Sequence, residues 1–146
     1  MAASQGSGYL EALGSHNKRN YASANFKAVA DDLYERAGVT PKDVDVAQLY
    51  ENFTGMVLMS IEDHGFCKKG EGGPFVEGGR IEIGGELPVN TSGGNLAEAY
   101  IHGFELVIEG VRQMRGESCN QVEDAEICLV AGGPGVAPCS DLILRR

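Results

Sequence analysis

The sequence predicts an α/β fold: a mixed, mostly parallel sheet that carries helices on both faces. Two observations support this prediction. Short apolar runs of buried-strand length recur along the chain, and stretches with apolar residues at helical spacing separate them. The resulting order is helix, strand, helix, strand, helix, strand, strand, which is typical of parallel strands joined through helices. At 146 residues the chain is long enough for one domain that buries a substantial core.

Three helices are predicted, at about residues 23–37, 54–64 and 95–115. In the first, Phe26, Val29 and Leu33 recur at positions i, i+3 and i+7, and Gly38 follows as a helix end. The third carries a narrow stripe of small and apolar residues, which predicts close packing against a sheet or another helix, with a partner expected to cover Gly103 and Gly110. That stripe consists of Leu96, Ala99, Gly103, Leu106, Gly110 and Met114.

Strands are predicted at residues 44–50, 87–90, 125–131 and 142–144, with a further short strand at 80–83. The opening residues 1–7 are small and polar, and their composition is poor for a strand. We therefore expect a loop segment over residues 1–22 and one folded domain over residues 23–146. Either a first strand is present in short and degenerate form, or the chain is the downstream part of something larger.

Composition and charge exclude several classes of protein. The net charge is −9 and no basic cluster exceeds two residues, so nucleic-acid binding is not expected. The apolar stretch Phe53–Ile61 is far shorter than the roughly 20 residues that span a bilayer, so no membrane contact is predicted. No secretory leader opens the sequence, and we expect a cytoplasmic location. The four cysteines lack metal-binding spacing apart from a single His64–Cys67 pair, so no metal site is predicted.

Two predicted strand ends carry the residues that indicate a ligand site. Residues 50–53 follow one strand and residues 90–94 follow another, and ligands of such sheets bind beyond the carboxyl ends of the strands. Gly93 and Gly94 let the backbone approach a ligand closely, and the helix start after them offers unpaired N–H groups. This arrangement suits a developing enolate or oxyanion.

Three motifs follow one another along the chain: Tyr-Glu-Asn-Phe at 50–53, Asn-Thr-Ser-Gly-Gly at 90–94 and Gly-Gly-Pro-Gly at 132–135. Together they resemble the C-terminal half of the thiolase superfamily, which implies the corresponding half of a thiolase-like fold. The resemblance is greatest to the branch of lipid-transfer proteins and sterol-carrier-protein thiolases, and within it to thiolase-like steroid side-chain aldolases. It covers about residues 6–144.

The chain departs from the thiolase pattern at three positions. Tyr50 stands at the first position of the thiolase Asn-Glu-Ala-Phe motif, Tyr100 at the histidine of Gly-His-Pro, and Leu129 at the acid/base cysteine. A Claisen-condensing enzyme needs one base for its nucleophilic cysteine and another for the α-carbon, so thiolase chemistry is not expected. The two tyrosines resemble the aldolase branch, which implies a CoA-linked, steroid-like substrate and no cofactor beyond that thioester.

A retro-aldol cleavage of a β-hydroxyacyl thioester needs a base for the β-hydroxyl and an acid for the enolate carbon, without an acyl-enzyme. We expect Tyr50 and Tyr100 to be this catalytic pair, with either assignment of acid and base. Gly93, Gly94 and Asn52 are expected to hold the thioester oxygen, and Asn52 has a helix cap as its alternative role. Two alternative functions stay open: a lipid- or acyl-CoA-binding subunit without catalysis, and a residual acyl-CoA acyltransferase (thiolase).

His102 is included among the candidate substrate contacts. It lies two residues beyond Tyr100, roughly 200° around a continuous helix, which favours a structural or interface role instead. Glu51 is expected at the surface or behind the site rather than as the base. The glycine-rich residues 67–85 match no phosphate-binding motif and are expected to form a lid or a contact loop.

The resemblance also implies partners. In the family the N-terminal half carries the nucleophile, and we expect that half to be supplied by a separate chain or to have been removed. The resemblance to the aldolase branch also implies a partner of the DUF35 type, which is a small oligonucleotide-fold protein. A homo- or hetero-oligomer is therefore expected.

Overall fold

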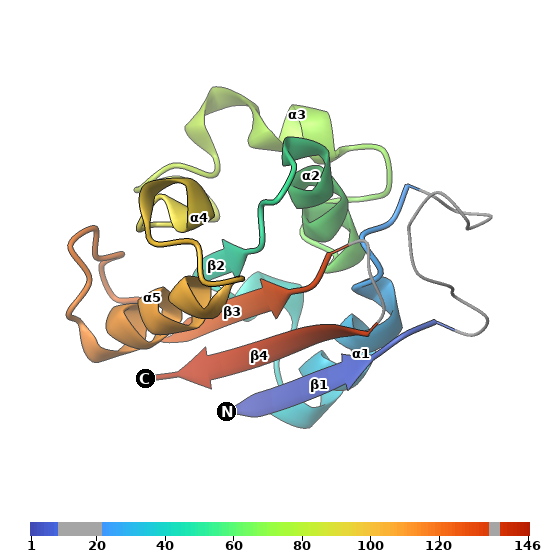
Figure 1. The fold of residues 1–146 in the computed structure, drawn as a ribbon, viewed down its shortest axis with the longest axis horizontal. Coiled ribbons are helices and arrows are strands. Elements are labelled where there is room, and N and C mark those ends of the chain that lie inside the picture. The colour runs from blue at the N-terminus through green and yellow to red at the C-terminus, as the bar shows by residue number, and fades with distance from the viewer. Residues whose placement is uncertain (9–21, 135–137) are drawn as a thin grey trace.

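The computed structural model describes residues 1–8, 22–134 and 138–146, and it shows a four-stranded mixed sheet with helices on both faces (Figure 1). Its order across the sheet is β1-β4-β3-β2. The strands are β1 (Ala2–Gly6), β2 (Val46–Leu49), β3 (Ile127–Gly132) and β4 (Cys139–Arg145). The predicted α/β class, with a mixed sheet and helices on both faces, is confirmed.

The sheet has fewer parallel strand pairs than predicted, because the sequence analysis expected a mostly parallel arrangement. β2 runs parallel to β3, whereas β4 is antiparallel to both of its neighbours, β3 and β1. Residues 133–138 alone connect β3 to β4, and a parallel pair needs a crossover of a dozen residues or more. The short connection therefore forces β4 to return antiparallel.

The opening residues form a strand, where the sequence predicted a loop. β1 pairs along its whole length with β4, and α1 (Lys27–Ala37) lies against it. A Cβ at Gly6 would lie only 3.2 Å from Val29 Cγ1, and Ser4 Oγ donates a hydrogen bond to Asp32 of α1 at 2.7 Å. Small and polar side chains thus suit a close edge strand, and β1 is the short first strand that the sequence analysis gave only as an alternative.

Two of the three predicted helices are confirmed, at 23–37 and 54–64. The helices are α1, α2 (Thr54–Asp63), α3 (Gly72–Val76), α4 (Gly94–Ala97) and α5 (Phe104–Arg115), with 3-10 turns η2 (Pro41–Asp43) and η3 (Glu77–Gly79). α1 begins later than predicted because the buried Asp63 carboxylate holds the residues before it. It accepts hydrogen bonds from Ser23 Oγ at 2.7 Å and from the Ala24 N–H at 2.8 Å.

The predicted helix at 95–115 is broken in two. α4 ends at Ala97 and α5 begins at Phe104, and the six residues between them are not helical. Tyr100, His102 and Gly103 have φ angles of 46°, 55° and 86°, which a right-handed helix does not contain. The apolar spacing continues across this break, so periodicity alone did not reveal it.

The weaker strand predictions are corrected in part. Residues 87–90 contribute one parallel bridge, between Val89 and Ala47 of β2, rather than a strand. Residues 80–83 form turns that hold this segment, because Leu87 N donates to Arg80 O at 2.9 Å and Val89 N to Ile81 O at 3.0 Å.

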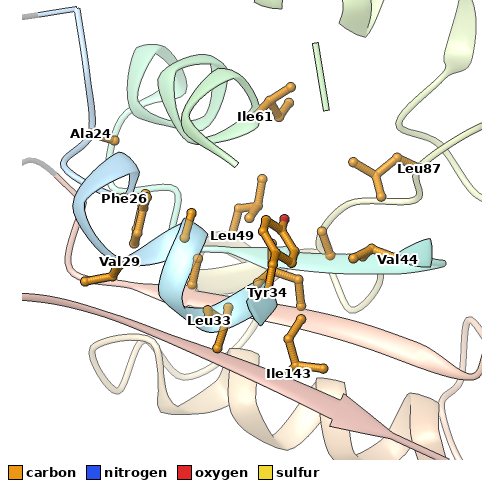
Figure 2. Close-up of a cluster of buried hydrophobic side chains, with 14 of the residues drawn as sticks. Ala24, Phe26, Val29, Leu33, Tyr34, Val44, Leu49, Ile61, Leu87 and Ile143 are labelled. Atoms are coloured by element: carbon orange, nitrogen blue, oxygen red, sulfur yellow. The ribbon is translucent and has the colours of Figure 1, made fainter. Parts of the chain in front are cut away.

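Successive residues of β3 face two separate cores. Leu129 and Ala131 pack into the larger core with α1 and α2, whereas Cys128 and Val130 pack under α5. Figure 2 shows side chains of the larger core converging from α1, α2 and the sheet: Phe26, Val29, Leu33, Tyr34, Leu49, Ile61 and Ile143.

The small-residue stripe packs against the chain's own sheet at its centre. A Cβ at Gly110 would lie 2.8 Å from Val130 Cγ2 and 3.0 Å from Leu144 Cδ1. The backbone of α5 therefore packs directly against side chains of the sheet, and a larger residue at this position would not fit without a shift. The expectation that a partner covers Gly110 is therefore wrong. Leu96, at the other end of the predicted stripe, is 90% exposed on α4. No helix within the described residues is long and apolar enough to cross a membrane.

Candidate functional site

Two tyrosine hydroxyls meet beyond the end of β2. Tyr50 follows that strand, Tyr100 lies in the connection between α4 and α5, and their hydroxyl oxygens are 3.0 Å apart. The rings meet edge to face at 6.3 Å between centroids, with an interplanar angle of 71°. Tyr50 is 9% exposed and Tyr100 is 44% exposed, so one phenol is buried and the other faces the solvent. The structure thus brings together the two residues that the sequence predicted as a pair.

The end of β2 is fixed by the first residue of the Asn-Thr-Ser-Gly-Gly motif. The Asn90 side chain accepts a hydrogen bond from the Leu49 N–H at 2.7 Å and donates one to the Leu49 carbonyl at 2.8 Å. On the other side, the Tyr50 N–H donates to the Ala131 carbonyl of β3 at 3.0 Å. Hydrogen bonds on both edges therefore fix the backbone at the end of β2, and with it the point at which Tyr50 leaves the sheet. The sequence analysis missed this role of Asn90.

Gly103 gives the Tyr50 ring its place. Its backbone lies against the ring, since a Cβ built on it would be 2.5 Å from Tyr50 Cδ2, and its φ of 86° also favours glycine. Because Gly103 has no side chain, the connection that carries Tyr100 can pass against the Tyr50 ring just before α5 begins.

Tyr50 is held in its neutral form. Burial raises the pKa of Tyr50 to about 12, and the hydrogen bond with Tyr100 and the charges of Glu105 and Glu51 act in the same direction. At neutral pH the Tyr50 phenol is therefore a proton donor.

A cavity of about 310 Å³ opens at the tyrosine pair. Among the described residues it is lined by Tyr50, Asn52, His102, Gly133 and Pro134. His102 therefore lies at the site, and its ring packs against Tyr100 at 5.6 Å between centroids. The expected separation of 200° between these two residues is wrong, because it assumed a helix that is interrupted there.

A second, larger cavity of about 710 Å³ shares His102 with the first. Its apolar wall comes from the start of α5 and from the sheet, at Ile101, Phe104, Val107, Val130 and Leu142. Polar residues, among them Ser4, Asp32 and Asp141, line the larger cavity as well, and neither tyrosine is among its described lining residues.

Glu51 occupies part of the helix start that the sequence analysis assigned to a ligand. Its carboxylate accepts hydrogen bonds from the Asn95 N–H and from Asn95 Nδ2, the latter at 2.8 Å. The same carboxylate lies against Gly94, which leaves no room there for a side chain. Asn52 is exposed, and its Oδ1 accepts from the Phe53 N–H at 3.1 Å. The oxyanion role of Gly93, Gly94 and Asn52 stays a prediction.

Residues 10–144 match the family described as Thiolase C-terminal domain-like. Over 116 residues the chain is 52% identical to the 17-hydroxy-3-oxo-4-pregnene-20-carboxyl-CoA lyase of Mycobacterium tuberculosis, covering 80% of this chain and 30% of that protein. Over 144 residues it is 44% identical to the steroid side-chain-cleaving aldolase of Thermomonospora curvata, covering 97% of this chain and 37% of that protein.

Among solved structures, the chain superimposes on a chain of the Ltp2-ChsH2(DUF35) aldolase with a TM-score of 0.94 and 44% sequence identity. That likeness covers 99% of this chain and 38% of the other. The sequence in hand thus spans 30% and 37% of the length of the two curated relatives.

Proposed function

The chain belongs to the thiolase C-terminal domain-like family, as its motifs predicted, and we propose that it carries the acid–base pair of an acyl-CoA lyase. In this proposal the enzyme cleaves a β-hydroxyacyl-CoA into a ketone and a shorter acyl-CoA by a retro-aldol reaction. The observation that carries the proposal is the 3.0 Å contact between the Tyr50 and Tyr100 hydroxyls beside a cavity. The names of its relatives, a CoA lyase and a side-chain-cleaving aldolase, support the same reaction type.

Each step of the reaction has a group to perform it. Tyr100, as its phenolate, removes the proton of the β-hydroxyl, whose oxygen becomes the ketone carbonyl as the Cα–Cβ bond breaks. The electron pair of that bond passes to Cα as a thioester enolate. Tyr50, protonated at neutral pH, returns a proton to Cα. Before the reaction, a hydrogen bond from Tyr50 stabilises the Tyr100 phenolate, and afterwards transfer of a proton from Tyr100 to Tyr50 across the 3.0 Å contact restores the starting pair.

The substrate is proposed to place its thioester at the smaller cavity and to extend its acyl group past His102 toward the larger one. Asn52 and the Gly93–Gly94 backbone are assigned to the thioester oxygen, and His102, which lines both cavities, to the substrate between them. Ile101 and Phe104 offer apolar contacts for a fused-ring acyl group. The proposed substrate is a steroid-like CoA thioester, and no further cofactor takes part in the proposed steps.

The chain is proposed to work within a larger assembly. Several apolar side chains around the site are exposed: Phe53, Leu96, Ile101 and Phe104. An exposed apolar group of this kind marks a contact surface. We assign it to the N-terminal half of the thiolase fold, in the same or a separate chain, and to a DUF35-type protein.

Turnover of a defined substrate tests the proposal. The chain, assembled with the rest of the thiolase fold, is incubated with a steroid β-hydroxyacyl-CoA, and the products are identified by mass spectrometry. We expect a ketone and a shorter acyl-CoA in equal amounts, with no requirement for free CoA. Tight binding without product would make the chain a lipid- or acyl-CoA-binding subunit, and CoA-dependent cleavage would make it a thiolase; either result overturns the proposal.

A further inference from the structure

We propose that Glu105 is a positioning residue, which fixes the Tyr100 hydroxyl against Tyr50; the inference rests on the function proposed above. Glu105 lies in the first turn of α5, is 1% exposed, and touches neither tyrosine hydroxyl in any hydrogen bond between described residues. Together with burial, its charge helps to raise the pKa of Tyr50, whereas its influence on the position of the Tyr100 hydroxyl runs through the backbone.

The Glu105 carboxylate clamps the connection that carries Tyr100. Oε2 accepts a hydrogen bond from the Ile101 N–H at 3.1 Å, and Oε1 accepts one from the Gly103 N–H at 3.2 Å. The first N–H belongs to the peptide group that follows Tyr100, and the second to the one that follows His102. One side chain therefore fixes the orientation of both peptide groups.

The clamped backbone is in a conformation that needs such support. Tyr100 and His102 are not glycines, and both have positive φ angles, of 46° and 55°. Non-glycine residues keep such angles only where the surrounding structure holds them. Without the clamp, rotation at Tyr100 would move its hydroxyl away from Tyr50, although the Tyr50 ring stays seated on Gly103.

A positioning role also explains why Glu105 is buried although no cation among the described residues pairs with it. No ion pair between described residues includes Glu105. Its carboxylate is instead stabilised by hydrogen bonds from backbone N–H groups. Buried carboxylates of this kind are costly unless hydrogen-bonded. Glu105 is therefore expected to act through these two bonds.

Glu109 supplies a matched control. It lies one turn later on α5 and is also 1% exposed. Its carboxylate accepts hydrogen bonds from Thr91 Oγ1 and Ser118 Oγ, each at 2.6 Å, and has none with the connection. Glu109→Gln therefore removes an equally buried charge from the same helix and leaves the clamp in place.

The test compares Glu105→Gln with Glu109→Gln in the assembled enzyme. We expect Glu105→Gln to lower kcat by about 10–100-fold, at the low end of the loss of a catalytic acid or base, with KM changed less than about three-fold. Glu109→Gln should keep kcat within about two-fold of the parent even if it is less stable. In a Tyr100→Phe background, Glu105→Gln should cause no further loss, because both changes remove the same positioned hydroxyl.

Amide hydrogen exchange makes the outcome independent of the proposed function. In Glu105→Gln the Ile101 and Gly103 amides should exchange faster than in the parent, and in Glu109→Gln they should not. If the parent cleaves no substrate but these amides respond as expected, the proposed function fails while the clamp stands. Unchanged exchange, or losses of kcat that add fully to that of Tyr100→Phe, would overturn the positioning role.

Discussion

At the scale of single residues, the site depends on the different surroundings of two identical phenols. Tyr50 is packed between the sheet and Gly103, and Tyr100 projects from an exposed connection. Tyr50 is therefore the stronger candidate for the proton donor, because burial disfavours its anion. The proposed assignment of acid and base, which the sequence left open, therefore rests on burial and not on residue type.

The titration of Tyr50 is a direct prediction of this environment. Its folded-state pKa is raised from 10.0 to about 12, so the protonated phenol stabilises the fold below pH 10, and that contribution is lost as the pH rises through about 12. In an NMR titration of the parent with ring-labelled tyrosine, the signal that Tyr50→Phe removes should titrate with its midpoint near 12. A midpoint of that signal near the ordinary value of 10.0 would contradict the burial argument.

Sequence reasoning brought together residues that lie close in the structure, but it did not predict their arrangement. Tyr100 contacts both Tyr50 and His102. Asn52 lines the smaller cavity with Tyr50 and His102, while the roles of all four stay predictions. The position of His102 relative to Tyr100 was wrong, because left-handed backbone at non-glycine residues leaves no pattern in a sequence. Glu105 was not named at all, since a glutamate in the middle of the predicted helix at 95–115 looks like a surface residue until its burial is seen.

At the scale of elements, the close contact between α5 and the sheet holds the scaffold of the site. Gly110 is the point of nearest approach, to Val130 of β3 and Leu144 of β4. The connection that carries Tyr100 leads directly into α5. Any change that lifts α5 from the sheet should therefore destabilise the fold before it alters the chemistry.

Two glycine substitutions test this contact. In an open helix Gly→Ala stabilises by up to about 1 kcal/mol, but overpacking costs about 1–3 kcal/mol. Because its Cβ would lie 2.8 Å from Val130 Cγ2, Gly110→Ala is expected to be destabilising by roughly 1 kcal/mol net in chemical denaturation. Gly55→Ala on α2 meets nothing within 4 Å and should be neutral or stabilising. If both substitutions stabilised the chain equally, the close packing of α5 would be wrong.

At the scale of the whole molecule, the sequence predicted the layers of the fold but not the direction of every strand. Alternating helices and apolar runs indicated an α/β sheet, and opposite faces of β3 indeed serve two cores. The antiparallel return of β4 was missed because two strands in succession carry no mark of direction beyond the length of their connection. β1 was considered only as an alternative to a loop because its small polar residues suit an edge position and are also typical of loops.

Two features of the whole molecule support the proposal that the chain works within a larger assembly. It spans 30% and 37% of its two curated relatives, and its exposed apolar side chains flank the tyrosine pair. A partner seated on Ile101 and Phe104 would close the larger cavity from the solvent. The proposed reaction gains from such closure, since hydrogen bonds to developing charge are stronger away from water.

The central claim is that the two hydroxyls, and not the rings that carry them, perform the cleavage. Its most direct test measures kcat for Tyr50→Phe and Tyr100→Phe in the assembled enzyme, with Tyr34→Phe as the control. The Tyr34 hydroxyl donates to the His64 carbonyl at 3.1 Å in the larger core, so its loss should affect stability and leave kcat unchanged. For the other two variants we predict kcat lower by about 10²–10⁴-fold, with melting temperatures close to the parent because ring volume is kept. Cleavage by both variants within about three-fold of the parent would contradict the account.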